Sequence, residues 1–133
     1  MKAPSSMGWP TRVAAGAALV FGALTIVSGS RVLFGGAAAQ AAAGDFVPFV
    51  LWFNFLSGFV YVLAGAGIAM GRRWAARLSI ALAVAIATVF ALFGLHVFQG
   101  GPFEMRTVGA MSLRLVVWIV IAAVLRRTLE PSG

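Results

Sequence analysis

The chain has 133 residues, of which 62% are hydrophobic and 10% charged, and its mean hydropathy of +1.01 lies far above that of soluble domains. Ten Lys and Arg against three Asp and Glu do not indicate a nucleic-acid interface, because most of these cations flank apolar segments, where they anchor membrane helices. The chain has no cysteine and one histidine, so we predict no disulfide, metal site or cofactor.

Four apolar segments follow one another along the chain, and each is long enough for a bilayer core of ~30 Å, which needs about 20 helical residues. They cover about 12–34, 46–70, 74–98 and 104–125. The first segment also has features of a signal peptide. Two cations, Lys2 and Arg12, stand at or before its start, and the small residues 37–43 follow it. We expect a retained helix, and whether residues 1–43 are ever processed stays open. Residues 1–133 then form a single domain.

The connecting segments GGAAAQAAAGD (35–45), GRRW (71–74) and QGGPF (99–103) are rich in helix breakers or charge. Arg31 and Arg106 stand at one side of the predicted spans. The other side carries seven cations, which are Lys2, Arg12, Arg72, Arg73, Arg77, Arg126 and Arg127. The four segments and their short connections predict an all-α, antiparallel bundle of four transmembrane helices. The positive-inside rule predicts that both termini lie in the cytoplasm. We expect it to be a multi-pass protein of the bacterial inner membrane.

Small residues recur at helical spacing in the first two segments and predict close helix packing. Gly22 and Gly29 are seven residues apart, as are Gly58 and Gly65. In a bilayer, helices associate through close fit and polar contacts, since lipid tails are as apolar as leucine. We therefore interpret these four glycines as packing positions. The alternative is that they line a groove for a ligand.

Arg114 is the polar residue that packing explains least, because it lies six residues inside the last apolar run. A charge at the bilayer centre costs roughly 2.5 to 3.5 kcal/mol on insertion scales. Arg114 either extends to the headgroups and binds lipid phosphate, or has a partner inside the protein. Asn54 is the internal partner that we predict, because it falls at a similar depth on an antiparallel neighbour, and Tyr61 is a second acceptor.

His96, Glu104 and Arg106 map to the same side of the membrane as Arg114 and Asn54. Together with Tyr61 they form a candidate polar pocket open to the outer face. Arginine donates in a forked geometry that suits carboxylate and phosphate, so the pocket would take a lipid headgroup, a small anion or a quinone carbonyl. A transporter has less support, because we find no interrupted pair of helices. No catalytic motif is present, and we predict that the protein is not an enzyme.

The segment LSGFVYVLAGAGIAMGRRWAARLSIALAVAIA (56–87) resembles small four-helix bacterial membrane proteins of the DoxX-like kind. The resemblance covers about residues 12–98. WFNF (52–55) and EMRTVGAMSLR (104–114) resemble uncharacterised bacterial membrane proteins. The DoxX-like resemblance implies an accessory role beside a membrane oxidoreductase or another complex. Our leading prediction is thus an accessory or structural subunit, contacting membrane lipids and either copies of itself or a larger complex. The alternative is a ligand-binding protein or small transporter that uses the pocket around Arg114 and Asn54.

Overall fold

The computed structural model describes residues 8–128, and across them the regular structure is entirely helical. The helices are α1 (Trp9–Phe34), α2 (Ala37–Ala43), α3 (Pro48–Ala69), α4 (Trp74–Phe98) and α5 (Met105–Thr128). Among them α1, α3, α4 and α5 are long and apolar enough to cross a membrane. The predicted all-α class and the four predicted spans are therefore confirmed, and these features indicate a multi-pass membrane protein.

The helix boundaries follow the local chemistry of the chain. Pro10 and Pro48 stand in the first turns of α1 and α3, where a missing N–H costs no helical hydrogen bond. α1 therefore begins at Trp9 rather than at residue 12. The expected loop 35–45 contains the short helix α2, whose AAAQAAA sequence has high helix propensity. Gly71, with φ of 67°, provides the left-handed residue that the tight turn between α3 and α4 requires.

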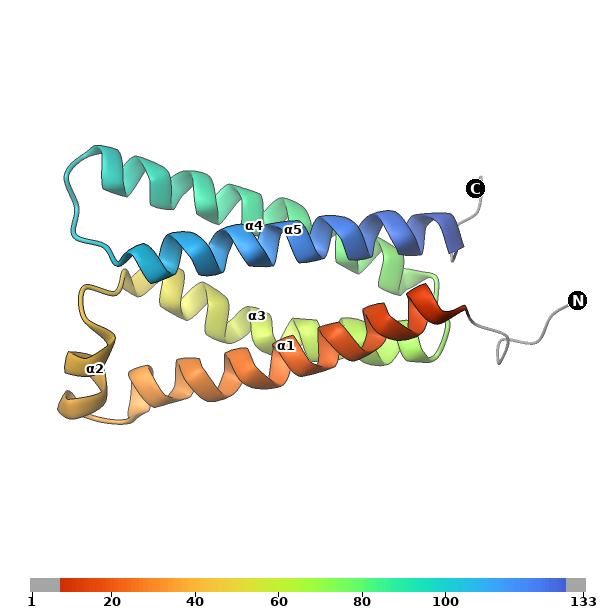
Figure 1. Ribbon diagram of the computed structural model, residues 1–133, viewed down its shortest axis with the longest axis horizontal. Coiled ribbons are helices and arrows are strands. Elements are labelled where there is room, and N and C mark those ends of the chain that lie inside the picture. Colours follow the sequence, from red (N-terminus) through yellow and green to blue (C-terminus); the bar gives the residue numbers. More distant parts are fainter. Residues whose placement is uncertain (1–7, 129–133) are drawn as a thin grey trace, which may run out of the picture.

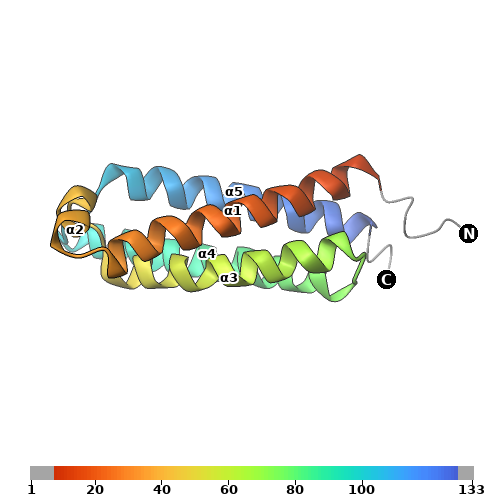
Figure 2. The same ribbon diagram turned by 90° about the horizontal axis from the view of Figure 1, so that it is seen from below.

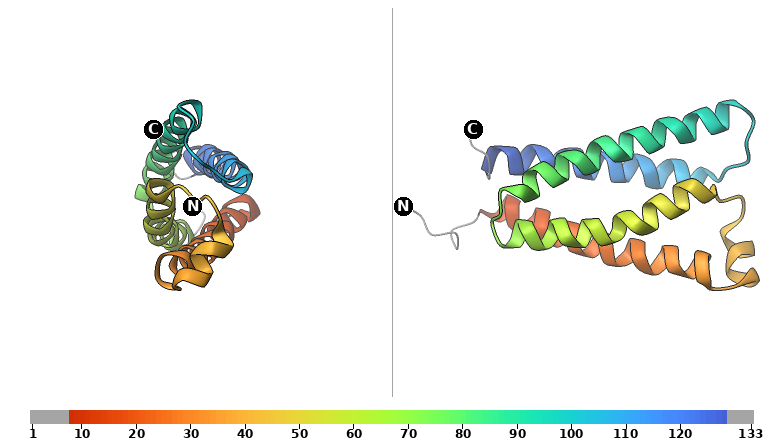
Figure 3. Two further views of the ribbon diagram at one scale, coloured as in Figure 1. Left: turned by 90° about the vertical axis from the view of Figure 1, so that its left-hand side faces the viewer. Right: turned by 180° about the vertical axis from the view of Figure 1, so that it is seen from behind.

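The four long helices lie side by side along the long axis of the molecule (Figures 1 and 2). The start of α1, the end of α5 and the turn 70–73 lie at one end, which we call the terminal end. Helix α2 and the connection between α4 and α5 lie at the other, which we call the loop end (Figure 1). α1 packs most closely on α3, and α4 on α5, while α1 and α5 touch much less. Figure 3 shows the two pairs from the loop end and from behind.

The interface between α1 and α3 is so close that it requires glycine. A Cβ added at Gly22 would lie 2.8 Å from the carbonyl oxygen of Gly58 and 2.6 Å from Val62 Cγ2. One added at Gly65 would lie 2.8 Å from Leu19 Cδ2, and one at Gly29 would lie 3.0 Å from Phe55 Cβ. All four predicted packing glycines thus lie between α1 and α3, where the two backbones approach each other.

Aromatic and aliphatic side chains fill the centre of the protein. Tyr61 of α3 and Trp118 of α5 are fully buried, with ring centroids 4.9 Å apart, and Phe93 of α4 is 1% exposed. The outward faces of the long helices carry exposed Leu, Val, Ile and Phe instead. Such an apolar exterior is compatible with a lipid environment. The polar residues inside the bundle are costly in that environment and need a functional explanation.

Candidate functional site

Arg114 is held between α5 and α1. Its Nη2 donates a hydrogen bond to Thr25 Oγ1 at 3.0 Å. Arg114 lies nine residues after Met105, where α5 begins, and Thr25 lies nine residues before Phe34, where α1 ends. At ~1.5 Å per residue, both are about 13 Å from the loop end of their helices. The guanidinium therefore lies between the helices, anchored well inside them, rather than extending to the headgroup level.

The predicted partnership of Arg114 with Asn54 is wrong, because the acceptor is Thr25. Asn54 Oδ1 is buried and has no hydrogen-bond partner among residues 8–128. Threonine gave no strong signal in the sequence, since a threonine hydroxyl inside an apolar helix is ordinarily satisfied by its own backbone. A weaker signal was present: Thr25, Ser28 and Arg31 follow one another at intervals of three in α1, and this spacing places them along one side of a helix.

Further polar atoms lie in the core near Arg114. The Tyr61 ring packs against Trp118, which lies one helical turn after Arg114 on α5. Within the described residues, neither the Tyr61 hydroxyl nor Trp118 Nε1 has a hydrogen-bond partner. Buried polar groups in proteins are nearly always hydrogen-bonded. The middle of this protein is therefore more polar than packing requires. Tyr61, the second acceptor predicted for Arg114, makes no hydrogen bond to it.

A groove of about 360 Å³ separates α1 from α5 at the level of Arg114. Leu24 and Leu113, on its two sides, are 60% and 54% exposed, so the groove opens towards the region that lipid tails would occupy. No carboxylate contributes to its lining within the described chain. Its principal lining residues are Leu24, Thr25, Ser28 and Arg31 of α1 and Leu113 and Arg114 of α5.

Arg31 is the second cation of this groove. It lies six residues after Thr25, which is about 9 Å nearer the loop end along α1. Its side chain is exposed and makes no ion pair or side-chain hydrogen bond with any residue in the range 8–128. Arg31 stands in the last turn of α1, where the helix dipole favours a cation. The dipole does not occupy the N–H donors of the guanidinium. Two arginines thus face one groove, and neither has an acidic partner among residues 8–128.

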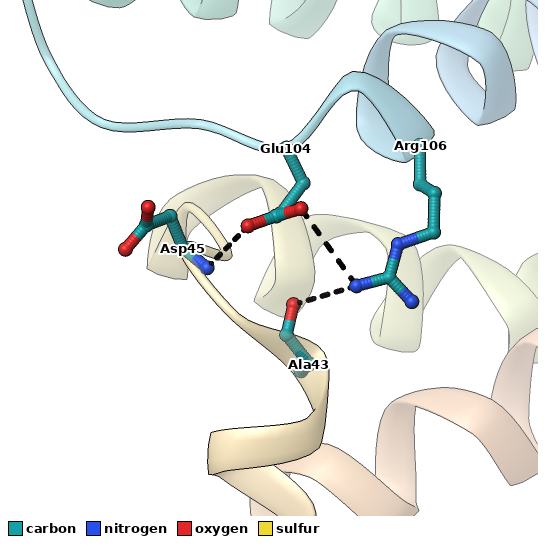
Figure 4. A network of polar contacts seen from close by, with 4 residues as sticks. All are labelled: Ala43, Asp45, Glu104 and Arg106. Atoms are coloured by element: carbon teal, nitrogen blue, oxygen red, sulfur yellow. Dashed lines mark hydrogen bonds and ion pairs between the residues drawn. The ribbon is translucent and has the colours of Figure 1, made fainter.

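Two predicted pocket residues, Glu104 and Arg106, form a clamp across the loop end (Figure 4), and His96 makes a separate contact within the connection between α4 and α5. Glu104 Oε2 accepts a hydrogen bond from the backbone N–H of Asp45 at 2.8 Å. Arg106 Nη2 donates to the carbonyl of Ala43 at 3.1 Å and lies 3.8 Å from Glu104 Oε1. His96 Nε2 lies 2.9 Å from the carbonyl oxygen of Pro102 and donates to it.

The clamp joins the segment after α2 to the start of α5, and its partners are mainly backbone atoms at the protein surface. Exposed ion pairs of this kind contribute ~1 kcal/mol or less. None of His96, Glu104 and Arg106 lines the groove that contains Arg114. The residues predicted to form one pocket therefore belong to two sites. Glu104 and Arg106 lie where α5 begins, at the loop end, whereas Arg114 lies more than two helical turns further along α5.

Comparison of the chain with protein-family models, with curated proteins and with solved structures finds no match. The class that the fold and the site define is a small, all-helical protein with four potential membrane spans and a groove, lined by two arginines, between its first and last long helices.

Proposed function

We propose that the protein binds the anionic group of a membrane ligand in the groove between α1 and α5. The observation that carries this proposal is that Arg31 and Arg114 line the same groove, in which no carboxylate from the described residues neutralises them. An arginine at membrane depth is costly, by roughly 2.5 to 3.5 kcal/mol near the centre. A guanidinium recovers that cost when its forked donors bind a carboxylate or phosphate. One of the five N–H donors of Arg114 binds Thr25 and orients the side chain.

The proposal includes a setting in the bacterial inner membrane, with the helices antiparallel and both chain ends in the cytoplasm. The cations support it: Arg72 and Arg73 stand at the turn of the terminal end, and Arg126 and Arg127 end α5 there. Asp45, Glu104 and Arg106 stand at the loop end. Lys2, which also entered the prediction, lies outside the described residues. With this orientation the groove opens into the outer leaflet.

The orientation is testable because the chain has no cysteine of its own. Gln40→Cys in α2 and Met70→Cys beside the turn of the terminal end both change exposed residues. In spheroplasts, a membrane-impermeant maleimide should label the first variant and spare the second until the membrane is lysed. Labelling of Met70→Cys in intact spheroplasts, with Gln40→Cys protected, would reverse the proposed orientation.

Anion binding is tested by thermal unfolding of the full chain in a neutral detergent. Dodecyl phosphate should stabilise the wild type by about 2.7 kcal/mol at a hundredfold excess over its dissociation constant, because a ligand that binds the folded state shifts the unfolding equilibrium. Dodecanol, which has the same chain and no charge, should have little effect. The double variant Arg31→Gln/Arg114→Gln should lose the response to dodecyl phosphate.

The matched control is Arg72→Gln/Arg73→Gln, which removes the same charge from the turn between α3 and α4. It should respond to dodecyl phosphate as the wild type does. An equal response from both double variants would show that the anion acts through general charge attraction, and would refute the proposed site.

The accessory-subunit role, self-association, the absence of enzymatic activity and the DoxX-like resemblance all stay predictions. Gly22, Gly29, Gly58 and Gly65 pack α1 against α3 within the chain, so they give no support to a surface for a partner subunit. Anion binding is therefore the function that the geometry favours.

A further inference from the structure

A second hollow of about 230 Å³, which we call the apolar channel, lies between the same two helices on the terminal-end side of the groove. No polar atom contributes to its surface. Its walls include Val13, Ala14 and Ala17 of α1 and Val116, Val120 and Ile121 of α5.

The polar and apolar parts follow each other along one seam. On α1, Ala17 of the apolar part lies one helical turn before Phe21 of the polar part. On α5, Val117 of the apolar part lies one turn after Leu113 of the polar part. The interface between α1 and α5 therefore carries two cations in its half near the loop end and only apolar side chains in its other half. That division matches an amphiphile with a charged head and an apolar tail.

The depths of the two arginines restrict the kind of amphiphile. α1 has 26 residues, so at ~1.5 Å per residue it is about 39 Å long, and it exceeds a ~30 Å core by about 4 to 5 Å at each end. Arg31 then lies near the hydrocarbon boundary. Arg114, at the level of Thr25, lies about 9 Å below it. A phospholipid with two tails keeps its phosphate at the headgroup level, whereas an amphiphile with one tail can descend until its head reaches Arg114.

We infer that the ligand is a single-chain anionic amphiphile, a long-chain carboxylate or an alkyl phosphate, with its head between Arg31 and Arg114 and its tail along the apolar channel. This inference rests on the proposed anion binding. Lipid tails are as apolar as the channel walls, so the channel adds little hydrophobic affinity over the surrounding bilayer. Its contribution is shape: the 230 Å³ between the two helices receives part of one tail on the terminal-end side of the arginines.

The test uses the full chain in phosphatidylcholine nanodiscs at alkaline pH and measures, by electron spin resonance, the motionally restricted fraction of chain-labelled probes. The probes are spin-labelled stearate, its methyl ester, and a phosphatidic acid with the same label. Stearate should associate about tenfold more strongly than either comparison probe, because a charge-assisted hydrogen bond to Arg114 contributes about 1.5 kcal/mol or more. The methyl ester lacks the charge for this bond, and phosphatidic acid, with two tails, keeps its phosphate above Arg114.

Two variants narrow the apolar channel without changing either arginine. Ala17→Phe fills it from α1, and Val120→Trp fills it from α5, where Val120 is 53% exposed. Each should weaken stearate association by about tenfold, as overpacking of a fitted site does. The matched control is Ala23→Phe, the same substitution on an exposed position of α1 that lines neither part of the groove. It should bind stearate as the wild type does.

The outcomes of this experiment distinguish the single-chain inference from the proposed anion binding on which it rests. Phosphatidic acid associating as strongly as stearate, or stearate binding that survives both channel variants, would overturn the single-chain inference and leave anion binding intact. Equal association of stearate and its methyl ester, unchanged in Arg31→Gln/Arg114→Gln, would instead remove the proposed function itself.

Discussion

Gly22→Leu should lower the free energy of unfolding by about 3 kcal/mol, the upper part of the range for overpacking, or more. A Cβ at this position would lie 2.8 Å from the Gly58 carbonyl oxygen and 3.0 Å from the Val62 backbone nitrogen. Backbone atoms cannot rotate away as a side chain can, so α1 and α3 would have to separate along their whole interface. Equilibrium unfolding of the purified protein by SDS, followed by circular dichroism, measures the loss.

Gly16→Leu is the control for this prediction, because Gly16 lies on the same helix and nothing approaches within 4 Å of an added Cβ there. It introduces the same side chain and the same gain in helix propensity. We expect Gly16→Leu to keep wild-type stability or exceed it. Similar losses in both variants would mean that close backbone contact between α1 and α3 does not stabilise the protein.

Arg114→Leu should raise the free energy of unfolding by about 1 to 3 kcal/mol, while abolishing stabilisation by dodecyl phosphate. Leucine removes a charge that is costly at this depth and that no carboxylate from the described residues pairs. Thr25 loses its donor in this variant, but its hydroxyl can donate to a carbonyl of its own helix instead. A gain in stability with a loss of binding is the pattern expected of a residue kept for function.

Thr25→Val distinguishes the role of Thr25 from that of Arg114. Valine has nearly the same shape as threonine and leaves the buried part of the guanidinium without its acceptor. An unsatisfied polar group of this kind costs about 1 to 3 kcal/mol, so we expect Thr25→Val to be less stable than the wild type. If Arg114→Leu proved as destabilising as Thr25→Val, Arg114 would be a packing residue rather than a binding residue.

The spans were predictable because runs of more than twenty apolar residues allow few structures other than a membrane helix. The glycine spacing likewise pointed to the helices that meet, because Gly22 and Gly58 can satisfy a close approach that other residues would block. The segment 35–45 was predicted as a short loop with at most a helical turn rather than as the seven-residue helix α2. Its flanking glycines at 36 and 44 are typical of a loop, while AAAQAAA alone favours a helix.

The site was predictable in part. Arg114 stands out by depth alone, but its partner depends on which faces of α1, α3 and α5 turn towards each other, and depth does not encode that rotation. Asn54 was therefore predicted as the partner, whereas the structure places Thr25 there. Arg31 was interpreted as a surface cation, because only the packing of α1 beside α5 brings it into the groove of Arg114. Glu104 was assigned to a shared pocket because it maps to the same side of the membrane as Arg114, yet it bonds the backbone of Asp45 across the loop end.

The central claim is that Arg31 and Arg114 together hold an anionic membrane ligand. Native mass spectrometry of the full chain, extracted with its lipids in a mild neutral detergent, tests it most directly. The wild type and Arg72→Gln/Arg73→Gln should both retain an anionic adduct of defined mass, and Arg31→Gln/Arg114→Gln should lose it. Identical adducts on all three proteins, or none on the wild type while neutral lipids remain bound, would contradict the claim.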